Sequence, residues 1–223
     1  MVTLAPELEG AQTTVQGLAS RQIIVSLGHS TATYDVGAAA LGAGATMLTH
    51  VFNAMPPLHH RKPGLAGLIA SEHAPFYSVI ADGIHLHPAV VTMAFRSNPE
   101  RCILISDSVE LAGMPDGVYP GHAQIPHRQH KQGNRVTIAG TDTLVGSTCG
   151  VDECVRNLVR FSGCSWPEAV RCASENIVDL MGIRDRGRIE AGRRADFVVL
   201  NAEGAVMQTW IGGRLIFDNE KAT

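Results

Sequence analysis

The stretch from Ile23 to Ala54 constrains the fold of this chain more than any other. Two apolar runs of strand length within it, IIVSLG and ATMLT, each end in a histidine, His29 and His50. One helix-like segment, Thr33 to Gly42, separates them. The pattern predicts a β-α-β unit with an imidazole at the carboxyl end of both strands, the edge where parallel sheets and barrels assemble their active sites.

Two histidines at equivalent strand ends have two readings. A single histidine in this position more often satisfies a buried hydrogen bond than it binds a metal. Two neutral imidazoles on neighbouring strand ends can share one ion, because zinc needs ligands that converge from separate elements. The repetition of the feature therefore favours a metal site formed by His29 and His50.

Strands and helices alternate through the first half of the chain. Strands are predicted at 2–5, 23–27, 45–49, 76–81 and 102–106, and helical segments at 9–20, 33–42, 65–71 and 88–97. Alternation at this spacing favours a parallel sheet with right-handed crossovers. The fourth strand runs into the sequence DGIH, residues 82–85, and the fifth ends at Asp107.

The second half of the chain has a different character. Residues 113–140 are rich in glycine, proline, histidine and glutamine, with short β-like patches such as 136–139, and we expect an excursion from the sheet. Two helices are predicted at 151–161 and 166–181, the second with a proline in its first turn. Strands at 195–200, 206–211 and 214–217, with a hairpin turn at Gly212-Gly213, predict a second, smaller β domain.

Composition limits the partners and the location of the protein. The chain has 223 residues, of which 45% are hydrophobic, enough for one sizeable domain with a core. A net charge of -3 argues against nucleic acid or an anionic membrane as the main partner. The five cysteines contain no CxxC pair, which argues against a disulfide framework or a cysteine zinc site. With no signal-peptide pattern at the start, a cytoplasmic location is expected.

Several motifs resemble those of a known family in their order and spacing. They are VTLAPE, VSLGHS, LTHVFNAMPPLHHRKPG, VIADGIH, ISDS and GTDTLVGS, followed by the closing run GRIEAGRRADFVVLNAEGAVMQTWIGGRLIF. Together they resemble the N-acetylglucosamine-6-phosphate deacetylases of the amidohydrolase superfamily, across nearly the whole chain. The run GRRADFVVL alone would indicate only the superfamily.

The resemblance implies an α/β fold, a (β/α)8 TIM-barrel-type metal-dependent hydrolase with an appended β sandwich. It implies that this chain enters at barrel strand four and forms an incomplete barrel, strands four to eight, over residues 1–190. Residues 191–223 would supply C-terminal strands of the small β domain. The family's first strands, and the acidic metal ligand on an LEGP-like strand end, have no counterpart here. Open strand edges favour pairing, and the family implies a homodimer.

The resemblance also implies chemical roles. His29 and His50 correspond to metal ligands, with zinc expected and iron, manganese or cobalt also accommodated. Asp107 corresponds to the catalytic aspartate, which takes a proton from metal-activated water and delivers it to the departing amine. The other reading of an aspartate at a strand end is a helix N-cap. Six further histidines are expected to face solvent: His59, His60, His87, His122, His127 and His130.

The same motifs imply a substrate site. His85 corresponds to a residue that contacts the substrate and stabilises charge on the carbonyl oxygen. Arg61 corresponds to a phosphate-binding arginine, against the plain reading of a solvated loop charge. The full set of implied substrate-binding residues is Asn53, Ala54, Arg61, Asp82, Gly83, Ile84, His85, Leu144, Val145 and Gly146. Val145 replaces the family's usual serine in the turn 144–146, and Ser108 replaces a frequent alanine beside the aspartate.

Three functions are compatible with these residues. The first is hydrolysis of the acetamide of N-acetylglucosamine 6-phosphate to glucosamine 6-phosphate and acetate, in amino-sugar catabolism. The second is another amidohydrolase reaction on a different amide, against which Arg61 and Asn53 argue. The third is a catalytically inactive fragment that binds a sugar phosphate or pairs with a full-length subunit, which the missing acidic ligand favours.

Overall fold

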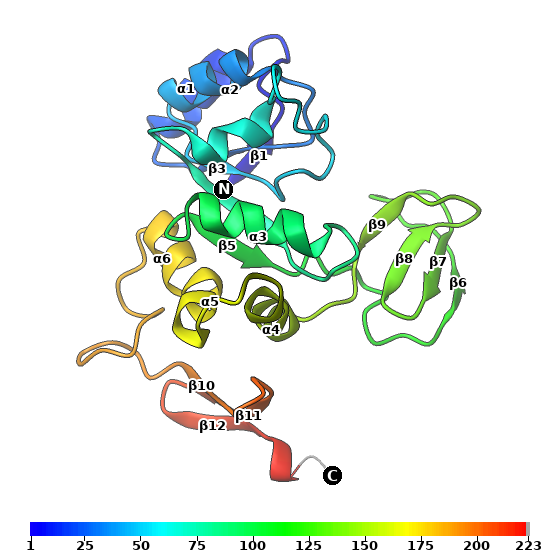
Figure 1. Ribbon diagram of the computed structural model, residues 1–223, viewed down its shortest axis with the longest axis vertical. Helices are drawn as coiled ribbons and strands as arrows, with labels where there is room; N and C mark the ends of the chain where they lie inside the picture. The colour runs from blue at the N-terminus through cyan, green and yellow to red at the C-terminus, as the bar shows by residue number, and fades with distance from the viewer. Residues whose placement is uncertain (222–223) are drawn as a thin grey trace.

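A parallel sheet of five strands forms the centre of the computed structural model, which describes residues 1–221 (Figure 1). The strands are β1 (Val2–Leu4), β2 (Val25–Leu27), β3 (Met47–Leu48), β4 (Phe76–Ile80) and β5 (Cys102–Ile105). Their order in the sheet is their order in the chain, and every neighbouring pair is parallel. The predicted parallel sheet is therefore confirmed, and all five carboxyl ends lie at one edge.

Helical segments connect these strands, as the alternation predicts. They are α1 (Ala11–Ala19), α2 (Tyr34–Gly42), the 3-10 helix η1 (Leu65–Ala70) and α3 (Pro88–Ser97). The Thr33 side chain accepts a hydrogen bond from the Val36 amide and caps α2, while Pro88 opens α3 with a φ already suited to a helix. Side chains such as Val25, Leu27 and Leu48 are fully buried in the resulting core.

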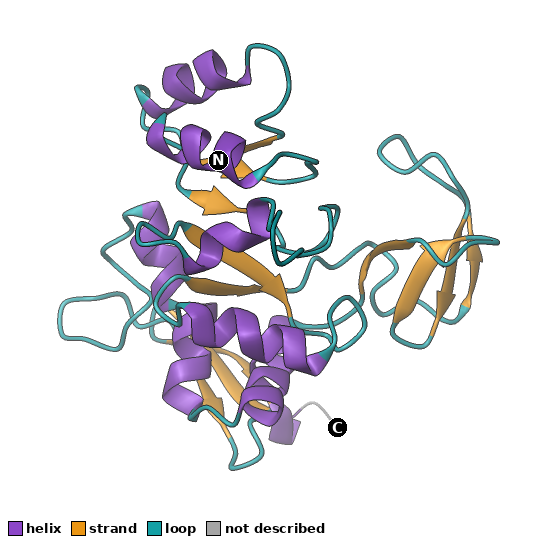
Figure 2. Cartoon of the chain, turned by 45° about the horizontal axis from the view of Figure 1, so that its top comes forward, coloured by secondary structure: helices purple, strands orange, loops and turns teal. Residues whose placement is uncertain are grey.

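The excursion from the parallel sheet forms a second, antiparallel sheet of four strands. These are β6 (Gly117–Tyr119), β7 (Gln129–Gln132), β8 (Arg135–Ile138) and β9 (Leu144–Ser147). Figure 2 shows this sheet standing to one side of the helices that surround the parallel strands. Strand β7 has no apolar pattern in the sequence, because its buried residues are the polar Gln129 and Lys131. The Lys131 ammonium group lies 3.2 Å from the Asp116 carboxylate.

The predicted turn at 144–146 is wrong. These residues lie in β9, which pairs with β8. Beyond that pairing, the Ser147 amide donates to the Asp107 carbonyl at 2.8 Å. Backbone pairing on both sides holds the segment extended, and a local sequence pattern does not reveal such pairing.

The predicted single helix at 166–181 is also wrong, because it breaks at Ser174. Helix α4 (Val151–Ser162) agrees with the prediction, but the next segment divides into α5 (Trp166–Ala173) and α6 (Glu175–Met181). Ser174 has φ -137° and ψ -73°, outside the helical region. Two residues later, the buried side-chain amide of Asn176 donates to the carbonyls of Pro99 (2.9 Å) and Cys102 (2.6 Å), which ties the start of α6 to β5.

Three antiparallel strands close the chain, as predicted. They are β10 (Phe197–Leu200), β11 (Val206–Ile211) and β12 (Arg214–Asp218), followed by the 3-10 turn η2 (Asn219–Lys221). Gly212 and Gly213 have φ of 57° and 75°, the positive values that a two-residue hairpin turn requires. The hairpin is confirmed, and the boundary at residue 190 stays a prediction.

Most of the five cysteines are packed away from solvent. Cys102, Cys149, Cys154 and Cys172 are buried and Cys164 is half-buried, and all five thiols are free. No helix within residues 1–221 combines the length and the apolar character needed to cross a membrane.

Candidate active site

The two predicted metal ligands lie against each other at the carboxyl edge of the parallel sheet. The Nε2 atoms of His29 and His50 are 2.9 Å apart, and the ring planes meet at 70°. His50 is 7% exposed, whereas His29 is open to solvent. The structure thus brings together the histidines that the sequence pattern singles out, while metal binding by them stays a prediction.

Backbone conformation is unusual directly after three of the strands. His29, His50 and Asp107 have φ of 48°, 27° and 50°, in the left-handed region that residues other than glycine rarely adopt. Each is the second residue after its strand, β2, β3 or β5. Such strain persists only where surrounding contacts enforce it, and it concentrates at functional sites. The sequence pattern does not predict the left-handed backbone at these three positions.

Contacts from β4 fix the position of His50. The His50 amide donates to the hydroxyl of the buried Ser78 at 2.7 Å, and the next amide, from Val51, donates to the Ser78 carbonyl at 2.8 Å. Burial lowers the pKa of His50, while the nearby Asp107 carboxylate acts in the opposite direction. The net lowering favours the neutral imidazole, which is the form that binds a metal.

A carboxylate that the sequence analysis does not single out holds the turn after His29. The Glu7 carboxylate accepts hydrogen bonds from the Ser30 hydroxyl (2.6 Å), the Thr31 amide (2.7 Å) and the Thr31 hydroxyl (3.2 Å). Burial acts to raise the pKa of Glu7, but these bonds outweigh it and the pKa lies below its usual value. Glu7 is the last residue of the VTLAPE motif, but the sequence does not indicate that its carboxylate bonds to Ser30 and Thr31.

The two imidazoles fit one part of a zinc site. Two nitrogen ligands at about 2.0–2.1 Å from a tetrahedral ion stand roughly 3.3 Å apart, within a few tenths of an ångström of the spacing here. Within residues 1–221, no group of three or more histidine, cysteine, aspartate or glutamate side chains converges to hold a metal. The Nδ1 of His50 is buried without a partner in the same part of the chain. The described residues therefore bring together two candidate nitrogen ligands, fewer than the four of a tetrahedral zinc ion.

The N-cap reading of Asp107 is wrong, because no helix follows it. The next regular element is β6, and the Asp107 side chain is open to solvent. Its carbonyl accepts from Ser147, at the end of β9, and a Cβ on Gly146 would lie 2.8 Å from that carbonyl oxygen. Only glycine permits this close approach. Gly146 of the predicted substrate loop therefore lies directly against Asp107.

The loop after β4 contains a tightly bonded aspartate–histidine pair. Asp82 Oδ2 lies 2.6 Å from His85 Nδ1, and Oδ1 accepts from the amides of Ile84 (2.8 Å) and His85 (2.9 Å). The side chains of Asp82 and His85 are 2% and 6% exposed. Burial acts to raise the pKa of Asp82, but the bonds from His85 and the two amides lower it below the usual value.

The remaining predicted substrate residues are less closely assembled. The Asn53 amide donates to the His50 carbonyl at 3.3 Å, and the Ala54 carbonyl accepts from the Ser30 amide at 3.1 Å. Both residues therefore border the histidine pair. Arg61 is exposed, and its guanidinium makes no hydrogen bond or ion pair within residues 1–221. The structure does not bring Arg61 into contact with the pair, and its phosphate role stays a prediction.

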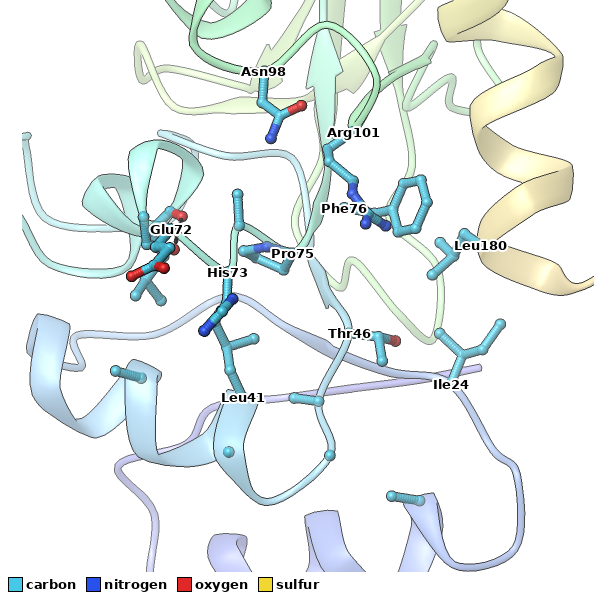
Figure 3. A pocket seen from close by; sticks show the side chains of 18 of the residues that line it. Ile24, Leu41, Thr46, Glu72, His73, Pro75, Phe76, Asn98, Arg101 and Leu180 are labelled. Atoms are coloured by element: carbon cyan, nitrogen blue, oxygen red, sulfur yellow. Dashed lines mark hydrogen bonds between the residues drawn. The ribbon is translucent and has the colours of Figure 1, made fainter.

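A large cavity lies at the other edge of the sheet. It measures about 1100 Å³ and borders the amino ends of β2, β3 and β4, where Ile24, Thr46 and Phe76 line it (Figure 3). The Arg101 guanidinium covers the Phe76 ring there at 4.5 Å. None of the predicted site residues lines this cavity. We therefore locate the candidate active site by its polar groups and not by the size of a hollow.

Known proteins resemble this chain over nearly its whole length. The N-acetylglucosamine-6-phosphate deacetylase of Danio rerio is 42% identical over 97% of this chain and 54% of its own length. The N-acetylgalactosamine-6-phosphate deacetylase of Escherichia coli O157:H7 is 38% identical over 96% of this chain and 56% of its own length.

A solved structure of the same kind of enzyme is also similar to this chain. A mutant of N-acetyl-D-glucosamine-6-phosphate deacetylase from Mycobacterium smegmatis, in complex with N-acetyl-D-glucosamine-6-phosphate, matches with a TM-score of 0.90 at 35% identity. The match covers 96% of this chain and 57% of that protein. The chain thus spans about half the length of these relatives. The profile of the amidohydrolase family matches residues 18–216, so the chain belongs to the amidohydrolase family, and within it resembles the N-acetylglucosamine-6-phosphate deacetylases.

Proposed function

We propose that this chain carries catalytic machinery for the hydrolysis of N-acetylglucosamine 6-phosphate to glucosamine 6-phosphate and acetate. The observation that carries the proposal is the left-handed backbone shared by His29, His50 and Asp107 at the ends of three strands. Two imidazoles within 2.9 Å of each other and a solvent-open carboxylate then lie at one edge. This donor set suits amide hydrolysis assisted by a divalent ion.

Four residues of the chain have separate roles in the proposed reaction. His29 and His50 would hold a divalent ion, for which we propose zinc; when bound, it lowers the pKa of water and polarises the amide carbonyl. Asp107 accepts a proton from the attacking water at its carboxylate and then delivers that proton to the departing amine nitrogen. His85 stabilises the charge that develops on the carbonyl oxygen.

The substrate proposal rests on the named activities of the relatives and on polar groups beside the histidines. Those relatives deacetylate N-acetylglucosamine 6-phosphate or N-acetylgalactosamine 6-phosphate, which differ in the sugar and share the phosphate. Arg61 would pair two phosphate oxygens with its planar fork. Asn53, Ala54 and residues 82–85 and 144–146 would border the sugar. A cytoplasmic homodimer, and a barrel that other strands complete, belong to the same proposal.

Acetate release from N-acetylglucosamine 6-phosphate by the 223-residue chain supplied with zinc tests the proposal. The blank is the double variant His29→Ala/Asp107→Asn, purified in the same way. Release above the blank supports catalysis by this chain. No release from a folded chain that binds zinc would contradict it.

A second candidate is an inactive chain that binds a sugar phosphate or pairs with a longer subunit. The observation in its favour is that His29 and His50 have no third ligand within residues 1–221. Calorimetric titration with the phosphosugar separates the two, because binding without acetate release supports only the second.

A further inference from the structure

Every oxygen of the Asp82 carboxylate is engaged by the protein. Oδ1 accepts from the amides of Ile84 and His85, and Oδ2 lies 2.6 Å from His85 Nδ1. With 2% of the side chain exposed, little of this carboxylate is open to a ligand. Asp82 therefore bonds to residues of its own loop. Any effect that it has on a substrate must act through His85, whose ring it contacts.

The contact decides which ring nitrogen of His85 carries a proton. An ionised carboxylate only accepts hydrogen bonds, so Nδ1 of His85 must be protonated to pair with it. Nε2 is then the ring nitrogen left for a ligand, since it has no hydrogen-bond partner within residues 1–221. In the neutral ring Nε2 accepts hydrogen bonds, and in the imidazolium it donates one.

Amide hydrolysis depends on how the ring of His85 is oriented. Negative charge grows on the carbonyl oxygen as water attacks, and a ring that interacts with this oxygen must be held in a fixed geometry. The contact of Asp82 with Nδ1 holds the ring from the opposite side, so that Nε2 faces away from Asp82.

Other ionisable groups near the loop do not compete for this role. Cys154 of α4 lies close to Asp82, and burial raises the pKa of its thiol, which keeps it uncharged. Arg160 of α4 stacks its guanidinium on the Phe161 ring at 5.0 Å, and Phe161 approaches the Gly83 position. Asp82 is the anion in direct contact with the His85 ring.

We propose that Asp82 is a positioning residue, which fixes the ring of His85 with Nδ1 protonated and so holds Nε2 in the orientation that meets the substrate. The role assigns Asp82 to the orientation of His85 and not to direct substrate contact. The catalytic part of this inference rests on the proposed deacetylase function, whereas the protonation of Nδ1 does not.

Nitrogen NMR of the 223-residue chain labelled with 15N-histidine tests the protonation directly. We expect Nδ1 of His85, assigned by its loss in His85→Gln, to stay protonated in both charge states of the ring. In Asp82→Asn the two backbone amides retain the side-chain oxygen, so the new NH2 group faces Nδ1. The neutral ring should then carry its proton on Nε2. A bare Nδ1 in the parent chain would overturn the proposal, even if the variant failed to fold.

Kinetics with the phosphosugar then separate positioning from substrate contact. Asp82→Asn should lower kcat about 10- to 100-fold with little change in KM, as for other groups that orient a catalytic side chain. In a His85→Gln background the same substitution should have almost no further effect, because the residue through which it acts is absent. Additive losses would overturn the positioning role. Asp35→Asn, an exposed aspartate on α2, is the matched control.

The two measurements keep the failures apart. A chain without acetate release whose NMR spectrum shows a protonated Nδ1 contradicts the deacetylase proposal and supports the arrangement at His85. Acetate release by a chain in which Nδ1 of His85 is unprotonated would support the deacetylase proposal and contradict the arrangement at His85.

Discussion

The two edges of the parallel sheet differ in a way that size alone does not reveal. The amino edge has a cavity of about 1100 Å³. The carboxyl edge has the strained backbone: of the six non-glycine residues with positive φ among those described, five lie there and only Gln22 lines the amino-edge cavity. Buried or bonded carboxylates, Glu7 and Asp82, also brace turns at the carboxyl edge. Strain and saturated polar contacts, and not volume, are therefore the observations that place the candidate site at the carboxyl edge.

The strongest test of this difference is Asp107→Asn. The amide has the same shape as the carboxylate but cannot take up the proton, so we expect kcat to fall about 100- to 10,000-fold. The variant should still bind zinc, because His29 and His50 remain. Competition with a chromophoric chelator measures this binding. Asp35→Asn should keep full activity. A variant with unchanged kcat would remove Asp107 from the mechanism.

Acidification should weaken the loop after β4. The pKa of Asp82 is lower in the folded chain than its usual 3.8, so its stabilising contribution is complete above that value and is lost as pH falls through the folded pKa. At neutral pH, Asp82→Asn should cost about 1.5–3 kcal/mol, as expected for hydrogen bonds to a charged group. Urea unfolding of both chains from pH 7 to pH 3 should show the gap narrow only at the acid end. A difference in stability that does not change with pH would contradict the lowered pKa of Asp82.

Glu7→Gln should have a smaller effect, on the turn that carries His29. An amide accepts fewer of the three hydrogen bonds from Ser30 and Thr31, so His29 is held less firmly. We expect zinc affinity to fall about tenfold, the lower end for residues that orient a ligand. Glu9→Gln, two residues away and exposed, provides the control and should bind zinc normally. Equal affinities in both variants would show that the Glu7 bonds are dispensable.

The smallest effect is expected at the amino edge. His73 is an exposed histidine that lines the cavity at the amino edge (Figure 3), whereas the candidate site lies at the carboxyl edge. His73→Gln should leave kcat, KM and zinc affinity unchanged, and stability within about 0.5 kcal/mol. A loss of activity in this variant would show that the two edges are functionally linked.

Local patterns predicted much of the fold because they are set by neighbouring residues. The boundaries of α3 follow from Pro88 and the apolar face, and the β11–β12 hairpin follows from Gly212-Gly213. The helix break at Ser174 could not be predicted, since it depends on the Asn176 bonds to Pro99 and Cys102, far away in the sequence. Strand β7 was missed for a related reason: its polar residues are buried only by the sheet around them.

The sequence by itself determined that His29, His50 and Asp107 follow three strands of one parallel sheet, because apolar runs of strand length and alternating helices place all carboxyl ends at one edge. Only the tertiary structure decided how the side chains meet there. The 2.9 Å approach of the histidines, the reach of Glu7 across to Thr31 and the left-handed backbone at Asp107 all depend on hydrogen bonds between separate elements. Such contacts have no local periodicity, so they arise only when the strands are packed.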